Sequence, residues 1–184
     1  MKQIDTLLID LLMDLLANDE NSGTCGPDLR WLFTDNGVLV ITGKGKMNDY
    51  LYRNRLPWYK YDIKRIIIGD GATTIGEAAF KDCSNLTSVT IPNSVTTIGR
   101  HAFNGCTNLQ KVYIGNSVKT IGEDAFNNCT SVTQISSEAV VPPTCDLNVF
   151  AGINKSKCKL IVPKNSLDAY KQADQWKDFF FNRW

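Results

Sequence analysis

Neither charge sign is in excess in this 184-residue sequence, which carries 20 lysines and arginines against 19 aspartates and glutamates. A balanced charge without a basic stretch gives no support for nucleic-acid binding. Long hydrophobic runs are also missing, and none approaches the roughly 20 residues that a membrane-spanning helix needs. We therefore expect no nucleic-acid partner and no membrane span. The hydrophobic share of 43% is ordinary for a globular chain.

Residues that could carry catalysis or hold a metal are scarce. His101 is the only histidine, and six cysteines are few for a disulfide-stapled scaffold of this size. No C-x-x-C pair occurs, and the glycines at 43 and 45 are not part of a G-x-x-x-x-G-K-S/T phosphate loop. We expect no catalytic residue, no metal and no cofactor, so the sequence does not predict an enzyme.

A 23-residue period dominates the middle of the chain, where residues 75–97, 98–120 and 121–143 begin IGEAAF, IGRHAF and IGEDAF. Aligning these copies gives columns of identical or similar residues. The columns are Ile75, Ile98 and Ile121; Gly76, Gly99 and Gly122; Phe80, Phe103 and Phe126; Cys83, Cys106 and Cys129; and Val95, Val118 and Val141. Self-similarity at a fixed period of about 20 to 50 residues is typical of a stacked-repeat protein.

Each copy predicts one coil with two short extended pieces. The stretch LTSVTIP indicates a strand that points Leu86, Val89 and Ile91 into the core. NSVTTIG supplies a second extended piece, and EAAFKDC a short helical or tight-turn segment. A single coil cannot bury its apolar face, so neighbouring copies must stack with strands about 4.8 Å apart. Half a copy, at residues 63–74, precedes the three fuller ones.

The cysteine column and the histidine call for different interpretations. One cysteine per repeat is too wide a spacing for a metal site, and three stacked thiols cannot all pair, which favours small buried thiols. Cys145 and Cys158 are close enough in sequence for a disulfide, which the sequence leaves open. His101 stands in a column with Ala78 and Asp124, so we expect an exposed residue of the turn and not a general base.

The flanks of the repeats predict covers for the two ends of the core. Asn36–Gly37 supports a tight β-hairpin turn between two apolar stretches. The aromatic run at residues 58–61 favours a capping cluster over a sugar site. At the other end, Ser166 is a candidate N-cap of a terminal helix. That helix would carry Tyr170, Trp176, Phe179 and Phe180.

The N-terminal stretch, residues 1–18, is rich in leucine. Ile4, Leu8, Leu11 and Leu15 follow helical spacing, while aspartates interrupt the apolar run that a secretory signal needs. An amphipathic helix is favoured, with a degenerate signal as the alternative. Such a helix would cover an open end of the core or self-associate with its twin from another copy of the chain. The expected divisions are residues 1–20, 21–62, 63–143 and 144–184.

The pattern L-x-x-V-x-I-P-x-S-V-x-x-I-G-x-x-A-F-x-x-C resembles the BspA-like, treponemal-type leucine-rich-repeat family. Residues 75–143 carry it strongly, and DNGVLVITGKGKM and LIVPKNSLDAYKQADQW resemble the flanking units of such proteins. The resemblance implies a leucine-rich-repeat solenoid of right-handed stacked β coils with short helical turns, an N-terminal β-hairpin cap and a C-terminal helix. It also implies a surface or secreted protein of the bacterial or protist type. Without a clear signal peptide, a cytoplasmic location stays open.

Outward positions of the repeat strands are where the copies differ, as expected of a binding surface on a regular scaffold. Two such columns are predicted to form a ligand surface, with Ile161 continuing the second. They are Arg65, Ser88, Lys111 and Gln134, and Ile67, Thr90, Tyr113 and Ser136. A tyrosine beside basic residues suits a protein or glycan ligand, so we expect a non-enzymatic interaction module. The family resemblance implies that this interaction serves adhesion. The alternative is a structural spacer or display domain.

Overall fold

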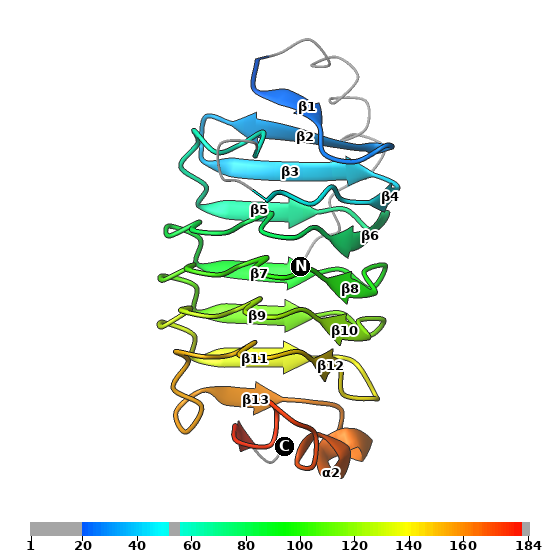
Figure 1. Ribbon diagram of the computed structural model, residues 1–184, viewed down its shortest axis with the longest axis vertical. Helices are drawn as coiled ribbons and strands as arrows, with labels where there is room; N and C mark the ends of the chain where they lie inside the picture. Colours follow the sequence, from blue (N-terminus) through cyan, green and yellow to red (C-terminus); the bar gives the residue numbers. More distant parts are fainter. Residues whose placement is uncertain (1–19, 52–55, 182–184) are drawn as a thin grey trace.

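The chain forms a β-solenoid of about six turns, seen in a computed structural model that describes residues 20–51 and 56–181. The coils stack along one axis, with an antiparallel unit at one end and a short helix at the other (Figure 1). The predicted solenoid of 23-residue repeats is therefore confirmed. The helix, the signal and the self-association considered for the N-terminal stretch fall on residues 1–19, which lie outside the described residues.

One strand of each coil lies along the same side of the solenoid. These strands are β5 (Arg65–Ile68), β7 (Ser88–Ile91), β9 (Lys111–Ile114), β11 (Gln134–Ser137) and β13 (Lys159–Ile161). From β7 to β13 they pair in parallel, so that Val112 lies between Val89 and Ile135. All three side chains are buried, as the sequence predicts. Ile135 then pairs with Leu160, which the sequence places on the inward side of the last strand.

A second sheet runs along the adjacent side. It consists of β4 (Gly45–Lys46), β6 (Ala72–Ile75), β8 (Thr97–Ile98), β10 (Thr120–Ile121) and β12 (Thr144–Cys145). Ile121 pairs with Cys145, one position beyond the repeat period. The sequence alignment was therefore wrong at Val141, which is 76% exposed instead of buried with Val95 and Val118. One extra residue in 138–143 lengthens the loop and carries Val141 out of its column.

The N-terminal unit extends the first side of the solenoid. Strands β1 (Ser22–Thr24), β2 (Leu29–Thr34) and β3 (Val38–Gly43) are antiparallel, and β3 pairs in parallel with β5. The predicted hairpin is confirmed, with Gly37 at φ 78° in its turn. An antiparallel pair thus closes an edge that would otherwise expose unpaired backbone groups.

The C-terminal cover differs from the long helix that the sequence predicts. The helical part is limited to a 3-10 turn (Lys164–Ser166) and α2 (Leu167–Tyr170), and the Ser166 hydroxyl makes no capping hydrogen bond. Gln175 has φ 66°, which a helix interior does not allow. The chain then ends in β14 (Phe180–Phe181), which pairs with β13. Phe180 was expected in the cover but is 55% exposed.

Bending the chain in this way lets the remaining aromatics reach the last coil. Tyr170, Trp176 and Phe179 are buried, as expected for a cover. Trp176 and Phe179 meet the Phe150 ring edge-on, at centroid distances of 4.8 and 5.2 Å. Tyr170 is fixed by its hydroxyl, which donates to the Ala139 carbonyl at 3.0 Å. Three positions so unevenly spaced along the chain could not all face the core from one short helix.

Phenylalanine rings form a stack through the centre of the solenoid. Neighbouring centroids are 5.2 Å apart from Phe80 to Phe103, 5.2 Å from Phe103 to Phe126 and 5.9 Å from Phe126 to Phe150. Trp58 stacks on the first ring at 5.7 Å and donates its indole N–H to the Ala79 carbonyl. A tryptophan therefore ends the stack on each side, which agrees with the interpretation of Trp58 as part of a cap, whereas Tyr59 of the same run is 53% exposed.

The backbone of the turn segments forms a ladder beside these rings. Phe80 N–H donates to the Ala102 carbonyl of the next coil at 2.8 Å, and Phe103 N–H donates to Ala125 at 2.8 Å. His101 has φ 54°, a left-handed conformation shared by Ala78 and Asp124 in its column. It is half-buried and not exposed as predicted, because its ring lies beside the Asp124 carboxylate of the next coil. His101 Nδ1 lies 3.6 Å from Asp124 Oδ2, too far for a hydrogen bond.

The cysteine column is a column of buried thiols. Cys106 and Cys129 are fully buried, and each donates its S–H to a phenylalanine carbonyl of the preceding coil, Phe80 or Phe103, at 3.2 Å. This confirms the prediction for these two residues, whereas Cys83 is half-buried at the start of the column. All six cysteines are free, so Cys145 and Cys158 are not joined.

Truncating a ring inside the stack tests how much it contributes. Phe103→Ala should lower the free energy of unfolding by about 3 to 5 kcal/mol, because it removes a buried ring between two others. Phe103→Leu keeps much of the apolar volume and should cost clearly less. Urea unfolding measures both. Equal losses for the two variants would contradict a contribution that depends on buried apolar volume, because leucine keeps much of that volume and alanine does not.

The half-buried thiol of Cys145 predicts an alkaline loss of stability. Burial raises the pKa of Cys145 to about 12, from 9.0 for a free thiol. Above pH 9 the unfolded chain releases a proton that the folded protein keeps, so the free energy of unfolding falls as pH rises toward 12, by about 1.4 kcal/mol per pH unit for each such thiol. The melting temperature of Cys145→Ala should therefore fall less steeply than that of the wild type above about pH 9. Parallel curves would contradict the raised pKa.

Candidate ligand-binding surface

The predicted outward residues lie together on one sheet. Lys111 is paired with Ser88 on one side and Gln134 on the other, while Tyr113 lies between Thr90 and Ser136. These lateral neighbours and the register are as the sequence predicts. Tyr113 is 36% exposed, whereas Val112 between the two outward side chains is buried. The alternation therefore places every second side chain on the outer face.

We call this surface the outward face and define it by ten residues. Exposed members are Arg65, Ser88, Thr90, Lys111 and Tyr113; half-buried members are Ile67, Gln134, Ser136, Lys159 and Ile161. Pairing of β11 with β13 places Lys159 beside Gln134 and Ile161 beside Ser136, which confirms Ile161 as the continuation of its column. Gln134 Nε2 donates to Ser136 Oγ at 3.1 Å, so part of the face is already ordered by its own side chains.

Charge on the outward face has one sign. Arg65, Lys111 and Lys159 are its basic residues, and none of its ten residues is acidic. The three lie in one column of side chains, on strands β5, β9 and β13. Tyr113 projects from the middle strand beside Lys111. Such a surface attracts acidic groups and offers one aromatic ring for packing.

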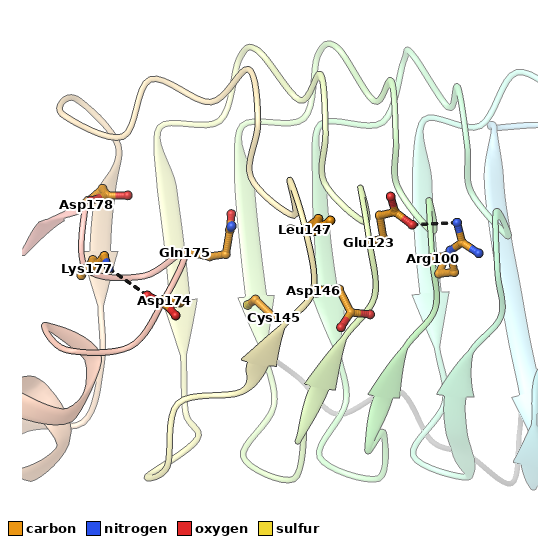
Figure 2. A pocket seen from close by; sticks show the side chains of 9 residues that line it. All are labelled: Arg100, Glu123, Cys145, Asp146, Leu147, Asp174, Gln175, Lys177 and Asp178. Atoms are coloured by element: carbon orange, nitrogen blue, oxygen red, sulfur yellow. Dashed lines mark hydrogen bonds and ion pairs between the residues drawn. The ribbon is translucent and has the colours of Figure 1, made fainter.

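A groove on another part of the molecule was not found from the sequence. Its volume is about 770 Å³, and it lies between the end of β12 and the C-terminal segment (Figure 2). One wall holds Asp146 and Leu147, and the other holds Asp174, Gln175 and Asp178. Sequence reasoning missed it because its walls are separated along the chain and lie where the period is broken.

The described part of the chain offers no metal site and no membrane-spanning helix. Within residues 20–51 and 56–181, no group of three or more histidine, cysteine, aspartate and glutamate side chains could hold a metal ion. No helix of this same part is long and apolar enough to cross a bilayer. The His101–Asp124 pair is half-buried inside the turn column and away from the outward face.

Comparison with known families agrees with this architecture. The model of the BspA type leucine rich repeat region matches residues 56–170 in six copies. This chain belongs to the BspA-type leucine-rich-repeat family. The match includes the strands β5 to β13 that build the outward face. No curated protein matches the chain.

Solved structures of bacterial leucine-rich-repeat proteins share the fold. A leucine-rich repeat protein from Eubacterium ventriosum is 28% identical, with a TM-score of 0.55 over 79% of this chain and 44% of its own. A leucine rich cell surface protein from Faecalibacterium prausnitzii is 23% identical, with a TM-score of 0.50 over 78% of this chain and 43% of its own. This BspA-type chain therefore spans less than half the length of either protein.

The register of the outward face predicts which substitutions the fold tolerates. Tyr113→Ala and Lys111→Glu should change the free energy of unfolding by no more than about 0.5 kcal/mol, because neither side chain builds the core. Val112→Ala, between them on the same strand, should lower it by about 2 kcal/mol. Urea unfolding of the three variants measures this. A large loss for Tyr113→Ala with none for Val112→Ala would contradict the register.

Proposed function

We propose that this BspA-type chain is a non-enzymatic protein-interaction and adhesion module. Its outward face would bind a protein or glycan ligand that carries acidic groups. The observation that carries the proposal is the combination of an exposed tyrosine with three basic residues and no acidic one. Desolvated tyrosines are frequent centres of binding energy, and basic neighbours favour an acidic partner.

The rigid scaffold supports a binding role. Three parallel strand pairings, from β7 to β13, hold the outward side chains in register, so little conformational entropy is lost when a ligand orders them. The cell-surface description of the Faecalibacterium prausnitzii protein supports a location on the cell surface or outside the cell. Adhesion is a proposal that follows from that location.

A binding screen tests this function. The purified chain is applied to an array of acidic and neutral glycans and extracellular-matrix proteins, and the affinity of each ligand found is measured. Tyr113→Ala should weaken binding about 5- to 30-fold, which corresponds to about 1 to 2 kcal/mol. Lys111→Glu should weaken it further, and added salt should reduce wild-type binding in the same direction.

Lys119→Glu provides the matched control, because Lys119 is an exposed lysine that immediately precedes β10 and does not belong to the outward face. It should bind like the wild type. An array without any ligand would favour the alternative of a structural spacer. A ligand that binds both outward-face variants normally would also contradict the proposed site.

A further inference from the structure

The backbone ladder of the turn segments is open at its C-terminal end. In the last complete step, the N–H groups of Asp124, Phe126 and Asn128 donate to carbonyls of the following coil at 2.9 to 3.0 Å. The equivalent donors of that following coil are Asn148, Phe150 and Gly152. Within residues 20–51 and 56–181, no acceptor meets any of these three N–H groups. Asn148 and Gly152 are both exposed residues.

The opposite end of the ladder is closed by the chain itself. The Glu77 carbonyl accepts from Tyr50 N–H at 2.9 Å, and the Ala79 carbonyl accepts from the Trp58 indole at 2.8 Å. A second copy could therefore not stack its first coil on the open end, because two carbonyls of that coil are already used. This argues for a different polypeptide as the partner of the open donors.

The acidic groove adjoins the open end. Leu147, which lines the groove and is 69% exposed, immediately precedes Asn148. Figure 2 shows Asp146 and Leu147 on one wall of the groove and the C-terminal segment on the other, with the Asp146 carboxylate directed toward the side of Glu123. Lys177 pairs with Asp174 at 2.8 Å, and Lys155 lies 3.5 Å from Asp178.

Negative charge in the groove is only partly compensated. Of its four carboxylates, Glu123 is paired with Arg100 at 2.7 Å, and two more are paired with lysines. The Asp146 carboxylate has neither a hydrogen-bond partner nor an ionic partner among the described residues. Among the residues that line the groove, four are acidic and two, Arg100 and Lys177, are basic. A basic side chain is the group that complements this surplus.

We propose that the open end of the ladder and this groove together bind an extended segment of a partner protein that carries basic side chains. Backbone carbonyls of the segment accept from the N–H groups of Asn148 and Gly152, as a further coil would. An extended chain directs carbonyls to the same side at alternate residues, which matches donors at 148, 150 and 152. A lysine or arginine of the segment lies against Asp146, and Leu147 supplies an apolar contact.

Nuclear magnetic resonance of the full-length chain tests this proposal. The probe is the peptide acetyl-(Lys-Thr)4-amide, and acetyl-(Glu-Thr)4-amide is its charge-reversed control. Binding of the basic peptide should saturate, and it should shift the backbone amide signals of Asn148 and Gly152 and slow their hydrogen exchange. The acidic peptide should have none of these effects. Asp146→Lys should weaken binding of the basic peptide at low salt by about fivefold or more.

Asp35→Lys is the matched control, because Asp35 is an exposed aspartate in the β2–β3 turn at the other end of the solenoid. It should leave the affinity unchanged. Three results would each overturn the proposal. They are the absence of binding, amide shifts spread over all exposed acidic residues, and an unchanged affinity of Asp146→Lys. This test is independent of binding at the outward face, because the basic residues of that face would attract the acidic peptide and not the basic one.

Discussion

Stacking of one phenylalanine over the next constrains the length of every coil. The rings of Phe103 and Phe126 lie 5.2 Å apart with an angle of 4° between their planes. Keeping this contact requires each coil to stay in register with the next. The last coil contains extra residues, but they fall in 138–143 and between Ile153 and Lys159, outside the ring column. The stack therefore continues to Phe150, and with it the strand register that builds the outward face.

The two ends of the solenoid are closed in unequal ways. Both use a buried tryptophan whose indole N–H bonds a carbonyl, Trp58 to Ala79 and Trp176 to Pro143. At the N-terminal end, the cap also donates to two carbonyls of the backbone ladder, those of Glu77 and Ala79. At the C-terminal end, the rings of Trp176 and Phe179 cover Phe150, but the backbone donors beside it have no acceptor in the described part of the chain. This difference leaves one end able to accept another polypeptide.

The repeat period accounts for what could be predicted from the sequence. Alignment of copies placed Lys111 and Tyr113 outward with correct neighbours, because parallel strands of equal coils must pair in register. Where the period is broken, prediction failed: Val141 left its column, and the terminal helix was limited to a few residues before the chain bent toward Phe150. The groove joins residue 146 to residues 174–178, a contact that no local pattern encodes.

Native-state hydrogen exchange of the backbone amides tests the stacked ladder most directly. If the coils form one cooperative unit, the amides of Phe80, Phe103 and Phe126 should exchange only through global unfolding and show the same high protection. Asn148 and Gly152, whose N–H groups lack acceptors in the described part of the chain, should exchange rapidly. Protection that falls stepwise from one coil to the next, or Phe126 exchanging as fast as Asn148, would contradict a continuous ladder held by the ring stack.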